Sequence, residues 1–119
     1  MNLKMLWWLP VIAVLGILMH SLAASVPDSE KAAAREKIQK GAKVVDVRTP
    51  DEFAAGHYAG AVSIPLQELE KRLSDVGPTN KPVVVYCLSG HRAGVAKQIL
   101  LKAGFTDVTN AGRLADMPK

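Results

Sequence analysis

The residue with the greatest chemical potential in this chain is Cys87, the only cysteine among 119 residues. It follows a β-favouring run at 83–86, and a helical pattern begins soon after it. The turn between them is Leu88, Ser89, Gly90, His91 and Arg92. N–H groups at a helix start lack intrahelical partners, and the positive end of the helix dipole lies there. This turn is therefore expected to hold an anion, with Arg92 and His91 adding positive charge, and to stabilise a nucleophilic thiolate.

A free cysteine is more commonly a small buried hydrophobe than a nucleophile. Three features oppose that interpretation of Cys87: its place where the strand stops, the polar sequence that follows it, and the lack of a second cysteine. With a single cysteine the chain cannot form an intramolecular disulfide, so Cys87 is not a structural crosslink. The sequence therefore predicts a reactive cysteine.

Two elements must position this turn, a buried strand before it and an amphipathic helix after it. Residues 83–86 are β-branched or aromatic, and Pro82 is tolerated only as the first residue of such a strand. From Arg92 onward the apolar residues recur at helical spacing, and Gly104 supplies a stop. The apolar face of this helix is expected to contain Val95, Ala96, Ile99, Leu100 and Ala103.

The other elements alternate between helix and strand. Thr49 has the features of an N-cap, with Pro50 at the first helical position and acidic residues after it. The expected helices are 26–40, 50–56 and 66–73, and the expected strands are 43–47, 61–64 and 105–109, followed by a turn at 110–112 and a tail at 114–119. Such alternation predicts an α/β fold in which helices cover both faces of a small parallel sheet.

Arg48 and Asp46 belong to the end of the expected strand 43–47. In open parallel sheets, ligands bind beyond the carboxyl ends of the strands. Arg48 could therefore share one pocket with Cys87. Asp46 lies within the strand, where an acid is rarely left unpaired, and we expect it to form an ion pair with an arginine.

Residues 1–24 have the composition of a secretory signal. Lys4 precedes an apolar run from Met5 to Met19, and small residues follow at 21 and 23–25. The run is fifteen residues long, whereas a membrane-spanning helix needs about 20. A cleaved signal is therefore favoured over an uncut membrane anchor. Residues 25–119 would then form one periplasmic or otherwise extracytoplasmic domain, which touches a membrane only if the N-terminal segment stays uncut.

Composition narrows the classes of function further. The net charge of +4 is mild, and basic residues are mixed with acidic ones without interleaved aromatics, which gives nucleic-acid binding little support. Three scattered histidines and one cysteine provide no metal-ligand spacing, and nothing in the sequence implies a cofactor. The length is that of one domain, and we expect a monomer.

With these pieces placed, the chain resembles the single-domain rhodaneses, and in particular the small exported thiosulfate sulfurtransferases of the phage-shock-protein E type. The resemblance spans about residues 43–118. It rests on five motifs in order, which are Asp46–Phe53, Gly56-His57 with Gly60-Ala61, Ile64-Pro65-Leu66, Cys87–Arg92, and Asn110-Ala111-Gly112 with Met117-Pro118-Lys119.

This resemblance implies a two-step sulfur transfer. The Cys87 thiolate would attack the outer sulfur of thiosulfate, release sulfite and retain a persulfide, which cyanide or a thiol would then discharge with ping-pong kinetics. By the same resemblance, the backbone N–H groups from Leu88 to Arg92 would cradle the persulfide. Arg92 would either help to hold the dianionic donor or brace the loop by pairing with Asp46. Arg48 has the same two possible roles, substrate binding or bracing.

The chain also departs from the family pattern. Tyr58-Ala59 stands where the family often has Ile-Pro, and Arg113 stands where it often has a second glycine. Arg113 could alter the choice of substrate, although an exposed loop residue is the simpler interpretation. His57 matches a turn residue of the family and is expected to be structural, whereas His91 could tune the cysteine or face solvent.

Two other functions are compatible with a reactive cysteine in this position. One is a non-enzymatic persulfide carrier or redox-sensing module that uses the same cysteine. The other is a cysteine phosphatase of related fold, whose Cys-x5-Arg loop encircles a tetrahedral phosphate. This chain has Cys-x4-Arg, from Cys87 to Arg92, with Tyr86 in place of a histidine before the cysteine. The shorter ring suits a sulfur atom better than a phosphoryl group.

Overall fold

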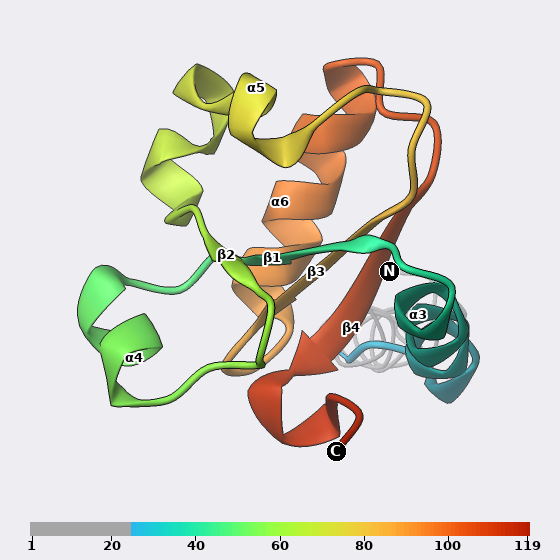
Figure 1. Ribbon diagram of the computed structural model, residues 1–119, viewed down its shortest axis with the longest axis vertical. Coiled ribbons are helices and arrows are strands. Elements are labelled where there is room, and N and C mark those ends of the chain that lie inside the picture. The colour runs from blue at the N-terminus through green and yellow to red at the C-terminus, as the bar shows by residue number, and fades with distance from the viewer. Residues whose placement is uncertain (1–24) are drawn as a thin grey trace, which may run out of the picture.

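Four parallel strands lie side by side in the order β2-β1-β3-β4 in the computed structural model, which describes residues 25–119 (Figure 1). The strands are β1 (Lys43–Asp46), β2 (Val62–Ser63), β3 (Val83–Cys87) and β4 (Val108–Arg113). The helices are α3 (Asp28–Gln39), α4 (Pro50–Ala55), α5 (Leu73–Val76) and α6 (His91–Lys102), with the 3-10 helices η1 (Leu66–Lys71) and η2 (Leu114–Asp116). The predicted α/β fold with a parallel sheet is confirmed. The predicted signal segment, 1–24, lies outside the described residues.

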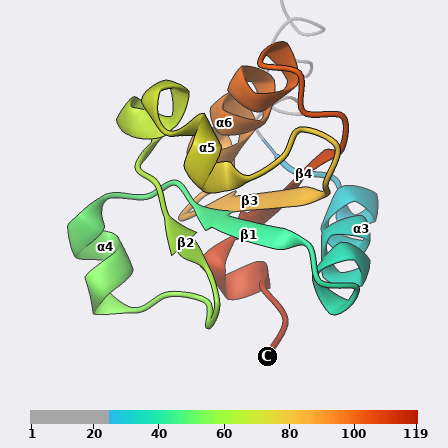
Figure 2. The same cartoon turned by 45° about the horizontal axis from the view of Figure 1, so that its top comes forward.

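Strand β3 is the centre of the domain and is buried along its whole length. It lies between β1 and β4, and Figure 2 shows the three strands together. Because side chains alternate between the two faces of a strand, Val83, Val85 and Cys87 face one core cluster, whereas Val84 and Tyr86 face the other. A run of β-branched residues therefore supplies both cores at once, as expected for a central parallel strand.

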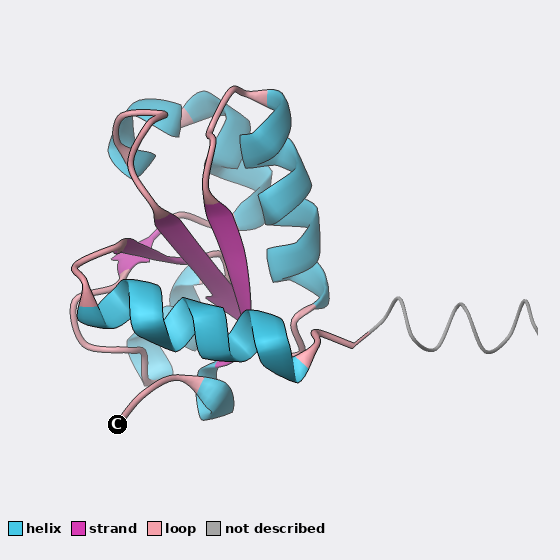
Figure 3. Cartoon of the chain, turned by 90° about the vertical axis from the view of Figure 1, so that its right-hand side faces the viewer, coloured by secondary structure: helices cyan, strands magenta, loops and turns pink. Residues whose placement is uncertain are grey.

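Helices cover both faces of the sheet, as predicted, with α6 on one side and α3 on the other (Figure 3). The cluster on the α6 side also includes residues of η1 and α5, and the cluster on the α3 side includes residues around η2. Within the part of the chain that the structure describes, no helix combines the length and the apolar character needed to cross a bilayer.

The buried face of α6 differs from the predicted one. The buried residues are Ala93, Ala96 and Leu100, whereas Val95 is 40% exposed. Ala103 is exposed as well. Two adjacent stripes of α6 are apolar, and the stripe with the smaller side chains faces the sheet. Helical periodicity alone does not distinguish two neighbouring stripes, so the prediction was wrong for Val95 and Ala103.

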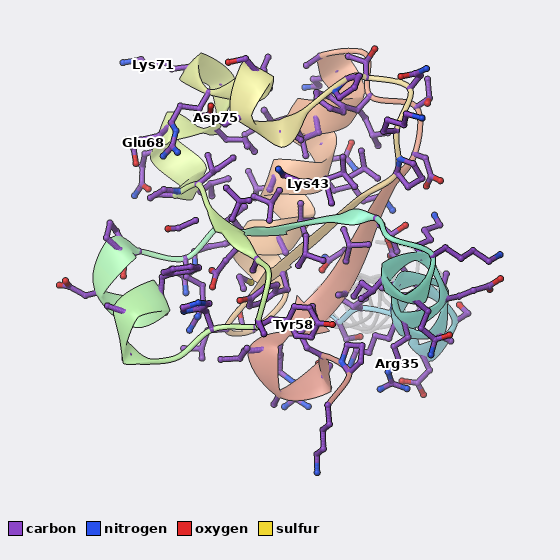
Figure 4. The ribbon with its side chains drawn as sticks, in the orientation of Figure 1. Arg35, Lys43, Tyr58, Glu68, Lys71 and Asp75 are labelled. Carbon is purple, nitrogen blue, oxygen red and sulfur yellow. The ribbon has the colours of Figure 1, made fainter. Side chains whose placement is uncertain are left out.

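The segment predicted as one helix at 66–73 is instead the 3-10 helix η1 followed by the short helix α5. Leu66 and Leu69 are three residues apart, which matches the three residues per turn of a 3-10 helix. Leu69 is fully buried, and Leu66 packs against the same cluster. Glu68, Lys71 and Asp75 are exposed and point away from the sheet (Figure 4).

Strand β4 lies later in the chain than predicted. The expected strand at 105–109 and turn at 110–112 are replaced by one strand from Val108 to Arg113. Its pairing with β3 shifts register, because Val85 is opposite Asn110 but Cys87 is opposite Arg113. The turn-forming residues therefore produce an irregularity inside the strand and do not end it.

Candidate active site

Cys87 is the last residue of β3, and its sulfur faces the start of α6. The Sγ atom accepts hydrogen bonds from the backbone N–H groups of Gly90 at 2.9 Å and Ala93 at 3.4 Å. The thiol is free and its residue is fully buried, with an exposed fraction of 0%. The cysteine thus lies against the positive end of a helix, as the sequence predicts.

The turn after Cys87 is shorter than expected, because α6 already begins at His91. Gly90 is the N-cap residue and has a φ of 92°, a left-handed conformation that glycine adopts without steric cost. Of the five N–H groups expected to line the turn, that of Gly90 contacts the sulfur, whereas that of His91 donates to Ser89 Oγ at 3.3 Å. Ala93 was not predicted, although the first turn of any helix offers such unpaired donors.

Leu88, Ser89 and His91 lie at the surface, outside the covered sulfur. Leu88 is 58% exposed, and Ser89 and His91 are also exposed. The residues of the turn are therefore exposed to solvent, although the thiol directly before them is fully buried. Solvent exposure is one of the two roles that the sequence left open for His91.

Arg92 forms a forked ion pair with Glu52 of α4 and not with Asp46, so the expected bracing contact with Asp46 is absent. Its Nη1 and Nη2 atoms donate to Glu52 Oε1 and Oε2 at 2.7 and 2.9 Å. These bonds are the largest cause that lowers the pKa of Glu52 to about 2, and bonds from Thr49 lower it further. A cation at a helix N-terminus opposes the helix dipole, so Glu52 offsets an unfavourable placement of Arg92.

Glu52 can reach Arg92 because α4 begins with a capping box. The Thr49 hydroxyl accepts from the Glu52 N–H at 3.2 Å, and Glu52 Oε1 accepts from the Thr49 N–H at 3.1 Å. Pro50 occupies the first turn, so the predicted cap is confirmed. The carboxylate that closes this cap is the one that pairs with Arg92. The sequence predicted the cap at Thr49 but not the ion pair between Glu52 and Arg92.

Asp46, Arg48 and Tyr86 form a buried network on the other face of the sheet. Arg48 Nε donates to Asp46 Oδ1 at 3.0 Å, and Arg48 Nη2 donates to Asp46 Oδ2 at 2.7 Å. Its Nη2 also donates to the Gly56 carbonyl at 2.7 Å. The Tyr86 hydroxyl donates to Asp46 Oδ2 at 2.7 Å. The expectation that Asp46 pairs with an arginine is confirmed.

This network leaves Arg48 buried and its donors engaged. Arg48 is 4% exposed, and its hydrogen bonds to Asp46 are the main cause that raises the pKa of its guanidinium. Burial raises the pKa of Tyr86 to about 12. The Tyr86 hydroxyl also accepts the N–H of Tyr58 at 3.0 Å, and Tyr58 packs against the cluster on the α3 side (Figure 4). The geometry favours the bracing role of Arg48.

His57 and Arg113 have structural partners. The His57 ring stacks on Phe53 with a centroid distance of 3.6 Å, and its Nδ1 lies 2.9 Å from the Phe53 carbonyl. Arg113 lies opposite Cys87 in the sheet, but its guanidinium forks onto Asp116 with two bonds of 3.0 Å. Its side chain is exposed, which agrees with the simpler interpretation of this residue.

Sequence reasoning assigned Asn110 to a turn and gave it no role at the site. The structure brings its side chain to the loop, where Nδ2 donates to the Gly90 carbonyl at 3.0 Å. Asn110 comes from β4 and is 5% exposed. No local signal in the sequence connects residues 90 and 110, because the contact depends on how the strands pair.

The arrangement is suited to hold negative charge on sulfur. Two N–H groups point at Sγ, and the first turn of α6 contains no acidic residue. Charge-assisted hydrogen bonds are about twice as strong as neutral ones. Such a site can support a thiolate nucleophile and a negatively charged adduct on the same atom.

The chain is similar to a known domain family and to a curated sulfurtransferase. The family model of the rhodanese-like domain matches residues 30–111. The thiosulfate sulfurtransferase PspE of Escherichia coli strain K12 is 45% identical over 78 residues, which cover 63% of this chain and 75% of PspE. The chain spans only about half to two thirds of the length of several other curated relatives.

Solved structures agree with the sequence comparison. A rhodanese with anions from E. coli aligns with a TM-score of 0.62 and 42% identity, over 66% of this chain and 95% of that one. The human single-domain sulfurtransferase TSTD1 aligns with a TM-score of 0.60 and 28% identity, over 78% of this chain and 93% of that one. Both alignments cover nearly the whole of the solved chain.

Proposed function

Because the chain belongs to the family of rhodanese-like domains, we propose that it is a thiosulfate sulfurtransferase that moves a sulfane sulfur through a persulfide on Cys87. The observation that carries this proposal is the pair of N–H groups, from Gly90 and Ala93, that point at the Cys87 sulfur. The same donors that stabilise a thiolate can stabilise the terminal sulfur of a persulfide, which is also an anion.

In the first step, the Cys87 thiolate attacks the outer sulfur of thiosulfate. A bond forms between Sγ and that sulfur, and the sulfur–sulfur bond of thiosulfate breaks. Sulfite leaves with the electron pair, and the enzyme retains the persulfide anion Cys–S–S⁻. Charge is conserved, because one thiolate and one dianion become one persulfide anion and one dianion. No proton, metal or redox partner is needed.

In the second step, an acceptor removes the outer sulfur and restores the thiolate. Cyanide takes the sulfur and leaves as thiocyanate, and a thiolate takes it and leaves as its own persulfide. We propose cyanide as the acceptor in assays and a thiol as the natural acceptor. Donor and acceptor react in turn with the same atom, so ping-pong kinetics are expected. The partners are small molecules, and the proposed enzyme is a monomer.

Arg92 is the basic side chain best placed to act on the donor. It is in the first turn of α6, directly after the turn that follows Cys87, and its side chain is 31% exposed. Leu88, Ser89, Gly90, His91 and Arg92 thus remain the proposed substrate-binding loop. Arg48 has its guanidinium committed to Asp46 and Gly56, so we assign it to bracing and not to the donor.

Access to the sulfur requires a movement of the turn, because Cys87 has no exposed surface. The exposed residues Leu88 and Ser89 lie directly after it. We expect a small displacement of these two residues to uncover Sγ when the donor binds. A covered resting thiol also suits an exported protein, because a lone cysteine in an oxidising compartment is otherwise prone to oxidation. Residues 1–24 would act as the signal that exports residues 25–119.

Intact-mass measurement tests the nucleophile and the reaction together. The purified protein is incubated with thiosulfate, and the mass is recorded before and after cyanide is added. We expect one added sulfur atom that disappears with cyanide, and no addition in Cys87→Ser, which changes one atom of the side chain. An unchanged wild-type mass, or an added sulfur in the variant, would refute the mechanism. The same spectrum of the exported protein locates its mature N-terminus.

Steady-state turnover separates this enzyme from a non-enzymatic carrier or redox module. A carrier loads one sulfur and passes it to a docked protein, whereas an enzyme forms thiocyanate repeatedly from thiosulfate and cyanide. Single loading without turnover would favour the carrier. Hydrolysis of an aryl phosphate tests the phosphatase, which the short Cys-x4-Arg spacing disfavours.

A further inference from the structure

Gly90 is the residue of the loop whose N–H contacts the sulfur, and glycine has no side chain that could fix its orientation. Its N–H donates to Cys87 Sγ at 2.9 Å, and its φ is 92°. Glycine has the widest conformational freedom of any residue, so a left-handed glycine at a loop–helix junction keeps one orientation only if its surroundings impose it. The direction of this N–H therefore depends on what contacts Gly90.

Asn110 provides such a contact from the neighbouring strand. Its Nδ2 donates to the Gly90 carbonyl at 3.0 Å, and that carbonyl also accepts the first hydrogen bond of α6, from Gly94. The N–H of Gly90 thus donates to the sulfur, whereas its carbonyl accepts a hydrogen bond from Asn110 in β4. Rotation of Gly90 away from Cys87 would break a buried hydrogen bond to Asn110.

The side chain of Asn110 is itself fixed at its other end. Its Oδ1 accepts the N–H of Gly112 at 2.8 Å, an Asx-turn contact in which a side chain bonds the backbone two residues ahead. Gly112 has a φ of 87°, and the register of β4 against β3 shifts at this point. The irregularity in β4 thus orients the Asn110 amide, because strand irregularities re-aim nearby side chains.

The backbone of Asn110 is anchored as well. Its N–H donates to Glu30 Oε2 at 2.9 Å, and Lys97 of α6 donates to the same oxygen at 2.6 Å. Glu30 belongs to α3, so two helices on opposite faces of the sheet contribute to the position of one asparagine. Val26 supports Gly90 from a second side, because a Cβ atom added to Gly90 would lie 3.0 Å from Val26 Cγ2.

We propose that Asn110 is a positioning residue of the active site, which holds the Gly90 carbonyl so that the Gly90 N–H stays directed at the sulfur of Cys87. The inference rests on the proposed function for its kinetic consequence but not for the geometry itself. Asn110 acts through Gly90 and does not contact the reacting atoms.

The test compares Asn110→Ser with Asn110→Ala and with a matched control. Serine can still accept the Gly112 N–H through the weaker Ser/Thr version of the same turn, but it is too short to reach the Gly90 carbonyl. Thr109→Val is the control, because Thr109 is 3% exposed in the same strand and its hydroxyl bonds Lys37 of α3 and not the loop. Both the serine variant and the control lose one buried polar contact.

The first readout is the amide-proton resonance of Gly90 in ¹⁵N-labelled protein, which reports its hydrogen bond to sulfur. We expect this resonance to move upfield in both Asn110 variants and to stay in place in Thr109→Val. The second readout is the single-turnover rate of persulfide formation with thiosulfate. A hydrogen bond to a charged group is worth about tenfold or more in such a rate, so we expect a loss of that size in Asn110→Ser and a change within about twofold in the control.

A Gly90 resonance that stays in place in Asn110→Ser would overturn the proposal, as would equal rate losses in Asn110→Ser and Thr109→Val. If Asn110→Ala does not fold, Asn110→Ser alone decides, because it keeps the turn. If the wild-type protein forms no persulfide, the proposed function fails while the Gly90 resonance still tests the position of the loop.

Discussion

Two arginine–carboxylate pairs lie near the same edge of the sheet, and they differ in almost every physical respect. Asp46 and Arg48 are two residues apart in the chain, and their side chains are 0% and 4% exposed. Glu52 and Arg92 are forty residues apart, and their side chains are 28% and 31% exposed. The first pair is within β1 and the residues that follow it, whereas the second connects α4 to α6.

The difference shows how the same residue types acquire separate roles. A buried ion pair is costly to form and still more costly to break, because removal of one partner leaves an uncompensated charge away from water. A partly exposed pair contributes little to stability, and its arginine remains within reach of the dianionic donor that we propose. The burial of Arg48 therefore favours a structural role, and Arg92 is the candidate for an effect on activity.

Arg48→Met provides the largest expected effect. It leaves Asp46 buried without its cation, so we expect the free energy of unfolding to fall by about 3–5 kcal/mol in urea denaturation. The activity of the remaining folded protein should stay within about threefold of wild type. As a control, the double variant Asp46→Asn, Arg48→Met should recover part of the lost stability. A stable variant with lost activity would instead place Arg48 at the substrate.

Arg92→Gln should give the reverse pattern at smaller size. The variant removes the arginine charge in the first turn of α6, so kcat/KM for thiosulfate should fall about tenfold, which corresponds to about 1.4 kcal/mol. Stability should fall by about 1 kcal/mol or less, because the pair is partly exposed to solvent. Arg72→Gln is the matched control, since Arg72 pairs with Asp75 outside the loop. Equal activity losses in both variants would contradict the proposed role.

Glu52→Gln should have the smallest effect, and one that depends on pH. The pKa of Glu52 is lowered from 4.5 to about 2 in the folded chain, mainly by hydrogen bonds from Arg92. Its contribution to stability is therefore present above about pH 4.5 and is lost as pH falls toward 2. We expect wild type to exceed the variant by about 1 kcal/mol or less at pH 6 and to match it near pH 2. A constant difference across this range would show that the contribution is not ionic.

Local patterns predicted most elements of the fold but not the buried face of α6 or the bounds of β4. The strand at 83–86, the cap at Thr49 and the alternation of helices with strands depend on neighbouring residues, and each was predicted. The buried stripe of α6 and the start of β4 were wrong. Both depend on contacts with distant segments, because Ala93 faces the sheet and β4 takes its register from β3.

The candidate site likewise combines features that one stretch of sequence predicts with contacts between distant segments that it does not predict. Cys87 at a strand end, a polar turn and a helix start are visible in one stretch of sequence. The partner of Arg92 is forty residues away in α4, and the asparagine that holds Gly90 is twenty residues away in β4. No periodicity or spacing rule reports such pairs, because they form only when the sheet aligns its strands.

By itself, the amino-acid sequence determined that one thiol stands before a helix start, and therefore which atom is the candidate nucleophile. The reason is local, since helix dipoles and unpaired N–H groups follow from the first turn of any helix. Only the tertiary structure decided which arginine is buried and which is partly exposed, and which side chain donates to the Gly90 carbonyl. Burial and ion pairing depend on segments that meet in space, and those meetings are set by the packing of the whole domain.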